Sequence, residues 1–165
     1  MSCLLVLAFS SQSGAERIIA DIHALQEQKD IDISDAALVI RKPDGKIRIK
    51  QASNLEKAEL VGDAFWGILF GLVFFMPWAG LPADTFSGKR TGNLNDYGIT
   101  DSFIKEAGST IQPGYSGLFL MVSNFTEAKL IEVLSRNKAT LLRIDLSRED
   151  VGKLSEAFGA VPREP

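Results

Sequence analysis

Apolar and polar positions along the first third of the chain predict a strand, a helix and a hairpin. Residues 1–9 are almost wholly apolar, as in a buried strand. A Ser-x-x-Glu capping box at residues 13–16 then precedes an amphipathic helix that ends near Gln28. The apolar face of this helix comprises Ile18, Ile19, Ile22 and Leu25. Residues 35–42 and 46–51 predict two strands joined by a Pro-Asp-Gly turn.

The second half of the chain shows the same alternation. Its predicted elements, in order, are a helix over 100–108, a strand over 115–123, a helix over 124–136, a strand over 139–145 and a helix over 147–159. The first residues of the three helices, Thr100, Asn124 and Ser147, are all capping types. The strand over 115–123 is apolar almost throughout, so we expect it at the centre of a sheet with both faces covered.

This order of elements predicts an α+β ferredoxin-like sandwich, with a mostly antiparallel sheet and helices on one face. We expect a single domain over residues 1–160 and a frayed tail over 161–165. An apolar helical insert over 58–81 and a polar loop over 83–96 interrupt the domain. Either the insert or a second subunit is expected to cover the other face of the central strand.

The insert contains eighteen consecutive residues without a charge, 64–81, which is long enough to suggest a transmembrane helix. Pro77 is expected to end or kink that helix. A helix over 61–76 would span about 24 Å at ~1.5 Å per residue, short of a ~30 Å hydrocarbon core. A single crossing would also separate two halves of the chain that we expect to share one sheet.

Three uses remain for such a helix: burial in its own domain, burial against another subunit, or shallow insertion at a membrane surface. Gly67 and Gly71 form a GxxxG pattern that lets helix backbones approach closely, although a neighbouring core element would use it equally well. The residues that we expect to mediate self-association or membrane contact are Ala64, Trp66, Gly67, Phe70, Gly71, Phe74 and Trp78.

The composition excludes several classes of function. Eighteen Lys and Arg residues against 21 Asp and Glu give a net charge of −3, which does not favour nucleic-acid binding. Cys3 and His23 are the only residues of their kinds, so an internal disulfide is excluded and a Cys/His zinc site has too few ligands. We therefore expect no cofactor or metal, and a cytoplasmic location.

Three sets of residues are candidates for chemistry or binding. Asp96, Tyr97 and Gly98 lie just before a predicted helix, where they can either hold a ligand or shape the helix start. Basic residues of the hairpin can meet acidic lipid headgroups or an acidic partner, or form an ordinary solvated face; they are Arg41, Lys42, Lys46, Arg48 and Lys50. A nucleophilic Cys3–His23 pair is disfavoured because Cys3 lies in a buried strand. No nucleotide-binding or nucleophile-elbow spacing is present.

Three segments carry a resemblance to a known family: GILFGLVFF at 67–75, LNDYGITDSF at 94–103 and IQPGYSGLFLMV at 111–122. With the first strand and the hairpin, they resemble a bacterial domain-of-unknown-function family, number twelve-sixty-nine, often described as predicted membrane proteins. The family is distantly similar to general stress proteins with a Gly-rich insert. The resemblance implies the fold and a membrane association but no activity. Relatives have a longer glycine-rich hairpin, whereas here a polar segment with Lys89 and Arg90 follows one apolar arm.

These observations lead to one main hypothesis and two alternatives. The main hypothesis is a non-enzymatic bacterial protein that self-associates as a homo-oligomer through the apolar helix, in the cytoplasm or at the inner face of the cytoplasmic membrane, with a structural or stress-related role. The first alternative is a small-molecule-binding or enzymatic ferredoxin-like dimer, in which Cys3, His23, Asp96 and Tyr97 would be the first residues to substitute. The second alternative is an integral membrane protein with one short span.

Overall fold

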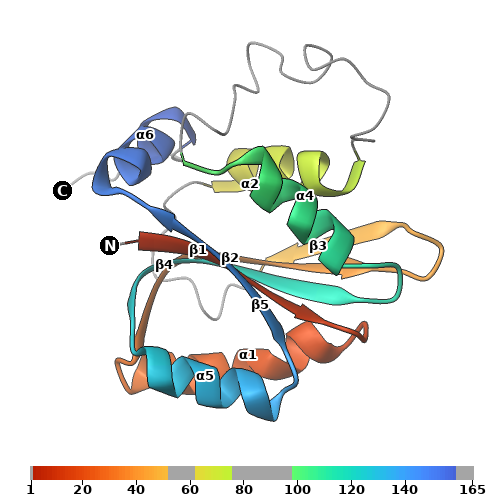
Figure 1. The fold of residues 1–165 in the computed structure, drawn as a ribbon, viewed down its shortest axis with the longest axis horizontal. Helices are drawn as coiled ribbons and strands as arrows, with labels where there is room; N and C mark the ends of the chain where they lie inside the picture. The colour runs from red at the N-terminus through yellow and green to blue at the C-terminus, as the bar shows by residue number, and fades with distance from the viewer. Residues whose placement is uncertain (1, 52–61, 76–97, 159–165) are drawn as a thin grey trace.

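The core of the protein is an antiparallel sheet of five strands (Figure 1). The computed structural model describes residues 2–51, 62–75 and 98–158. The described strands are β1 (Ser2–Phe9), β2 (Ile31–Arg41), β3 (Ile47–Gln51), β4 (Ser116–Phe125) and β5 (Thr140–Leu146). Their order in the sheet is β3-β2-β4-β1-β5, and every neighbouring pair is antiparallel.

This strand order confirms the predicted α+β ferredoxin-like class. Helix α1 (Gly14–Glu27) connects β1 to β2, and α5 (Glu127–Arg136) connects β4 to β5. Each connection skips one strand position, so the four strands interleave as β2-β4-β1-β5, the arrangement of two split βαβ units. Strand β3 extends the sheet at its β2 edge as the second arm of the predicted hairpin.

Helices cover both faces of the sheet, so the prediction that they lie on one face is wrong. Helices α1 and α5 cover one face (Figure 1). The opposite face carries α2 (Gly62–Phe70), the π-helical turn η1 (Gly71–Phe75), α4 (Asp101–Thr110) and α6 (Arg148–Phe158). The physical reason lies in β4, where Leu118 and Leu120 join the core beneath α1 and α5 while Phe119 and Met121 join the other core. A strand that is apolar on both sides requires two covering layers.

The apolar insert supplies part of the second layer from within the same chain. Its buried side chains are Phe65, Trp66, Leu69, Phe70 and Val73. Instead of one regular helix over 61–76, the structure has the nine-residue α2 followed by η1. Among the described residues, no helix is both long enough and apolar enough to cross a bilayer. The predicted polar loop over 83–96 and the tail over 161–165 lie outside the described residues.

Two of the predicted helix caps are confirmed. The Thr100 side chain accepts a hydrogen bond from the Phe103 amide at 3.2 Å. Ser147 and Asp150 form a reciprocal capping box, with N–H to side-chain oxygen distances of 3.0 and 3.2 Å. The predicted hairpin turn is also confirmed, since Gly45 adopts a φ of +90° that favours glycine.

Three local predictions are wrong. Ser13 is the N-cap of α1 but its side chain makes no capping hydrogen bond. Asn124 lies within β4, and Thr126 is the N-cap of α5. Gly108 does not end its helix, which continues to Thr110. A Cβ at Gly108 would lie 2.6 Å from the Val73 carbonyl oxygen, so this glycine allows α4 and η1 to approach closely.

Candidate functional site

The loop between β1 and α1 lies beside the turn between α5 and β5. This proximity follows from the sheet, because β1 and β5 pair antiparallel with Ala8 opposite Thr140. The end of β1 therefore meets the start of β5, and the chain segments adjoining those two ends meet as well. One segment is Ser-Ser-Gln-Ser at 10–13, and the other is Arg-Asn-Lys at 136–138.

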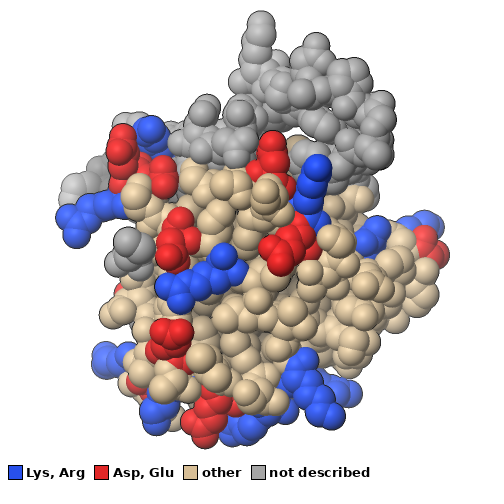
Figure 2. All heavy atoms as spheres, in the orientation of Figure 1, with Lys and Arg blue, Asp and Glu red and all other residues tan. Residues whose placement is uncertain are grey.

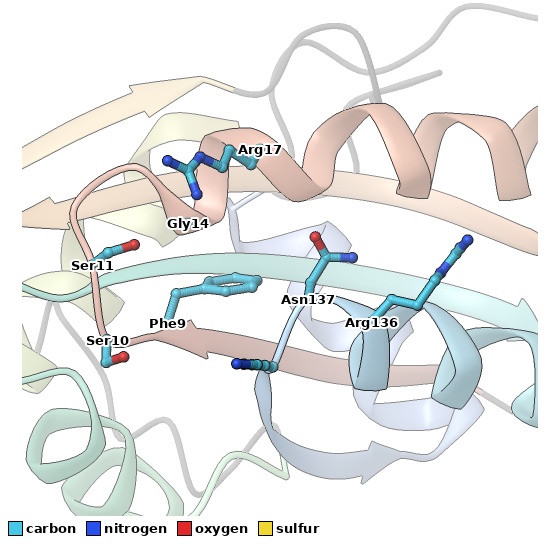
Figure 3. Close-up of a pocket in the computed structure, with 8 residues that line it drawn as sticks. Phe9, Ser10, Ser11, Gly14, Arg17, Arg136 and Asn137 are labelled. Atoms are coloured by element: carbon cyan, nitrogen blue, oxygen red, sulfur yellow. The ribbon is translucent and has the colours of Figure 1, made fainter.

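A pocket of about 320 Å³ lies between these two segments (Figure 3). Its lining residues are Phe9, Ser10, Ser11, Gly14, Arg17, Arg136, Asn137 and Lys138. Figure 3 shows the Phe9 ring between the start of α1, which carries Gly14 and Arg17, and the end of α5, which carries Arg136 and is followed by Asn137. The volume is at the lower end of the ~300–1,000 Å³ range of small-molecule sites.

The wall formed by the β1–α1 loop is held in place by Ser116, a fully buried residue of β4. Its hydroxyl donates to the Ser11 carbonyl oxygen at 2.7 Å and accepts from the Ala15 amide at 3.0 Å. Gly14 permits close contact with the strand, because a Cβ there would lie 2.4 Å from the Phe9 Cβ. The position of the loop is thus fixed by the two hydrogen bonds of Ser116 and by the close approach that Gly14 allows.

The opposite wall is the end of α5, which closes in a Schellman motif. The Lys138 amide bonds to the Ser135 carbonyl oxygen, and the Ala139 amide to that of Leu134. Lys138 adopts a φ of +55°, a left-handed conformation that glycine adopts at lower cost. The Asn137 side-chain amide donates to Asp21 of α1 at 2.9 Å, which ties the two helices together.

The pocket carries a local positive charge on a chain whose net charge is −3. Arg17, Arg136 and Lys138 line it, and no carboxylate is among the lining residues. Within the described part of the chain, none of these three side chains forms an ion pair or a side-chain hydrogen bond. Figure 2 shows acidic and basic groups interspersed on the face that it displays, so the protein's cations are not gathered into one broad patch there.

These groups determine what the pocket can do chemically. Two serine hydroxyls and three cations offer hydrogen-bond donors and positive charge, which are the groups that bind anions. The Asn137 side-chain amide adds no free donor, because it already donates to Asp21 and to the Val133 carbonyl oxygen. The lining contains no His, Asp or Glu that could act as a general base. In the described residues, no group of three or more His, Cys, Asp and Glu side chains is placed to hold a metal ion.

The predicted self-association residues divide into two groups. Trp66 and Phe70 are buried in the core, and the half-buried Phe74 packs against it. Gly67 is exposed, and a Cβ added at either Gly67 or Gly71 would meet no atom within 4 Å. Ala64 lies in α2, where its side chain is not described, and Trp78 lies outside the described residues. Gly67 and Gly71, here called the glycine edge of the insert, are therefore the members of this set with space for a partner to approach.

The motif before α4 is described only at Gly98, since Asp96 and Tyr97 lie outside the described residues. Gly98 has a φ of +90°, and a Cβ there would lie 2.6 Å from the Asp150 Oδ2 atom. Both observations favour a structural role for this glycine in packing against α6.

The five basic residues of the hairpin do not act as one surface. Arg41 turns inward, where it donates to the Ile111 carbonyl oxygen at 2.9 Å and lies over the Phe74 ring. Lys50 pairs with Glu16 of α1 at 2.9 Å. Lys42, Lys46 and Arg48 are exposed. Contact with an acidic partner stays a prediction for these three residues.

Cys3 and His23 have separate partners. Cys3 is buried, and its thiol donates to Asp145 at 3.4 Å. Burial, and then the hydrogen bond to Asp145, raise the pKa of this thiol, so it stays protonated at neutral pH. His23 lies on α1 with Glu27 at 3.7 Å, and neither residue lines the pocket.

Sequence reasoning missed the pocket, although it had one usable signal. A strand that runs into a serine- and glycine-containing loop at a helix start is a frequent setting for anion binding. The cations at 136–138 belong to a separate segment, and nothing in the local pattern connects them to that loop. Only the pairing of β1 with β5 connects them.

The architecture defines an α+β ferredoxin-like domain whose second face is covered in part by an insert of its own. The sequence matches the family described as protein of unknown function (DUF1269) over residues 60–159, and the chain belongs to that family. The match starts at the insert, so it does not include the first strand and the hairpin, on which the resemblance also rested. Neither a curated protein nor a solved structure matches the chain. The similarity to general stress proteins is not confirmed.

Proposed function

We propose that the protein binds a small anionic ligand in the pocket between the β1–α1 loop and the end of α5. The observation that carries this proposal is the lining itself: Arg17, Arg136 and Lys138 without a carboxylate and without ion pairs to other described residues. Because no carboxylate in the pocket neutralises these cations, they favour the binding of an anion from solution. Of the functions that the sequence leaves open, small-molecule binding has the most direct support.

The free energy of binding at the proposed site is expected to come from electrostatic attraction by the charges that line the pocket. A net charge of −3 repels anions at long range, so the attraction must arise within the pocket. Hydrogen bonds from Arg or Lys to an anion contribute about 1.5–3 kcal/mol each. Because the pocket is open to solvent, we expect added salt to weaken binding.

A titration of the full chain with sodium phosphate, followed by amide NMR, tests the proposal. The amides of Ser10, Ser11, Gly14 and Lys138 are expected to shift together and saturably. Replacing Lys138 by glycine is expected to weaken binding about tenfold, the equivalent of ~1.4 kcal/mol. The fold should survive this substitution, because glycine relieves the left-handed backbone at that position.

Lys29→Gly is the matched control. Lys29 occupies the same position of a Schellman motif at the end of α1, with a φ of +64°, and does not line the pocket. It therefore repeats the backbone change without removing a pocket charge. Equal phosphate affinity in the two variants, or the absence of saturable shifts in the unmodified chain, would contradict the proposal.

Self-association through the glycine edge of the insert is a second candidate, supported by the exposure of Gly67 and the open space above it. A second copy of this helix could pack closely against such an edge. If so, Gly67→Leu should shift an oligomer to monomer in sedimentation velocity without lowering stability. A chain that sediments as a monomer at every concentration would exclude this candidate.

A further inference from the structure

The charge balance of the pocket identifies the class of anion. Arg17, Arg136 and Lys138 supply three positive charges to a lining without a carboxylate. We infer that the ligand is a phosphate monoester, bound as its dianion; this inference rests on the proposed function. A monoanion such as a carboxylate would leave more of the positive charge unmatched than a group that carries nearly two negative charges.

The donors of the lining also suit a phosphoryl group. A phosphate monoester presents three strong acceptor oxygens, and a guanidinium can bond two of them at once. Arg17 and Arg136 provide two such groups from different helices, and the Ser10 and Ser11 hydroxyls add donors from the loop.

Two acidic residues of α1, the helix that carries Arg17, have partners of their own. Asp21 accepts a hydrogen bond from Asn137, and Glu16 is paired with Lys50. Neither carboxylate lines the pocket. The positive charge of the lining is therefore available to the ligand.

The rest of the lining limits the organic part of the ligand. Phe9 is the one aromatic residue of the lining and is only 4% exposed, so its ring offers little surface on which a base could stack. The other lining residues are polar, charged or glycine. We therefore expect a compact, polar organic group on the phosphate, and no base-stacking contribution to affinity.

The pH dependence of binding tests this inference. The second ionisation of a phosphate monoester lies near pH 6, so lowering the pH from about 7.5 to about 5 reduces the dianion fraction about tenfold. Arginine and lysine side chains in general lose their protons only well above this range. We therefore expect the apparent affinity for methyl phosphate, measured on the full chain by amide NMR at constant ionic strength, to fall about tenfold.

Sulfate is the control, because it is a dianion at both pH values. Its affinity should change little, whereas a pH-dependent change in the protein itself would alter the binding of both anions. Equal affinity for methyl phosphate at the two pH values would overturn the inference, as would equally tight binding of acetate. Either result would leave anion binding in place. If no anion shifts the pocket amides, the proposed function fails as well.

Two sources of a phosphate monoester can be separated with vesicles. Phosphatidic acid presents a monoester headgroup and phosphatidylglycerol a diester, each diluted in phosphatidylcholine. Flotation with phosphatidic acid only, lost in Lys138→Gly and kept in Lys29→Gly, would support a lipid-borne monoester. Binding of methyl phosphate without flotation would support a soluble one. Equal flotation with both lipids, together with loss in Lys138→Gly, would contradict selection for a monoester.

Discussion

Replacing Phe70 by alanine is expected to lower the free energy of unfolding by about 3–5 kcal/mol. The Phe70 side chain is 1% exposed and packs edge-to-face against the Phe119 ring of the central strand, with ring centroids 4.8 Å apart. Removal of the ring leaves a cavity between the insert and the sheet. Since small domains have a total stability of about 5–15 kcal/mol, this loss is large.

Urea unfolding of the full chain measures this effect, with Ile131→Ala as the control. Ile131 is 48% exposed on α5, so its truncation should change stability by about 0.5 kcal/mol or less. A loss below about 1 kcal/mol in Phe70→Ala would mean that the ring does not pack against its own sheet. Phe70 would then be free for a membrane or a second subunit, and the core assignment of the insert would be wrong.

The sheet and most of its connections could be predicted because their signals are local. Alternation in the hairpin, the apolar run of β4 and the capping box at Ser147 each identify an element from a few consecutive residues. The order of those elements then restricts the topology to few solutions. The split βαβ arrangement follows from that order.

The partner of the insert could not be predicted, because hydropathy indicates burial without showing what covers the helix. A helix with Phe65, Phe70 and Trp66 is equally apolar whether it faces a sheet, a bilayer or a second subunit. What decides between these partners lies in another part of the chain. Strand β4 is apolar on both faces and needs a covering layer on each, and the insert covers one of them. The switch from α2 to η1 also has no signal in the local pattern.

The pocket escaped prediction for a related reason. Arg17, Arg136 and Lys138 are each typical of a solvated helix surface when considered alone. Their significance depends on the β1–β5 pairing, which places segments from opposite ends of the chain side by side. The basic hairpin was the obvious cluster in the sequence, yet Arg41 and Lys50 are engaged in contacts within the fold.

Replacing Asp35 by alanine is the second substitution with a large expected effect. Asp35 is 1% exposed and lies where the pairing of β2 with β4 shifts register. Its Oδ1 atom accepts hydrogen bonds from the Trp66 indole at 3.1 Å and from the Ala36 amide at 3.0 Å. Alanine leaves two buried donors without this acceptor, at about 1–3 kcal/mol each, so we expect a loss of about 2–5 kcal/mol.

Asp35→Asn separates the acceptor from the charge, because its carbonyl oxygen can still accept both hydrogen bonds. We expect it to retain more than half of the stability that alanine loses, measured by the same urea unfolding. If asparagine and alanine cost the same, the carboxylate acts through its charge and not as an acceptor for Trp66. Retention of stability by asparagine would instead indicate that the side chain acts as the acceptor for the Trp66 indole. That hydrogen bond joins α2 to β2 at the register shift, and it specifies one position of the insert on the sheet, which apolar packing alone does not do.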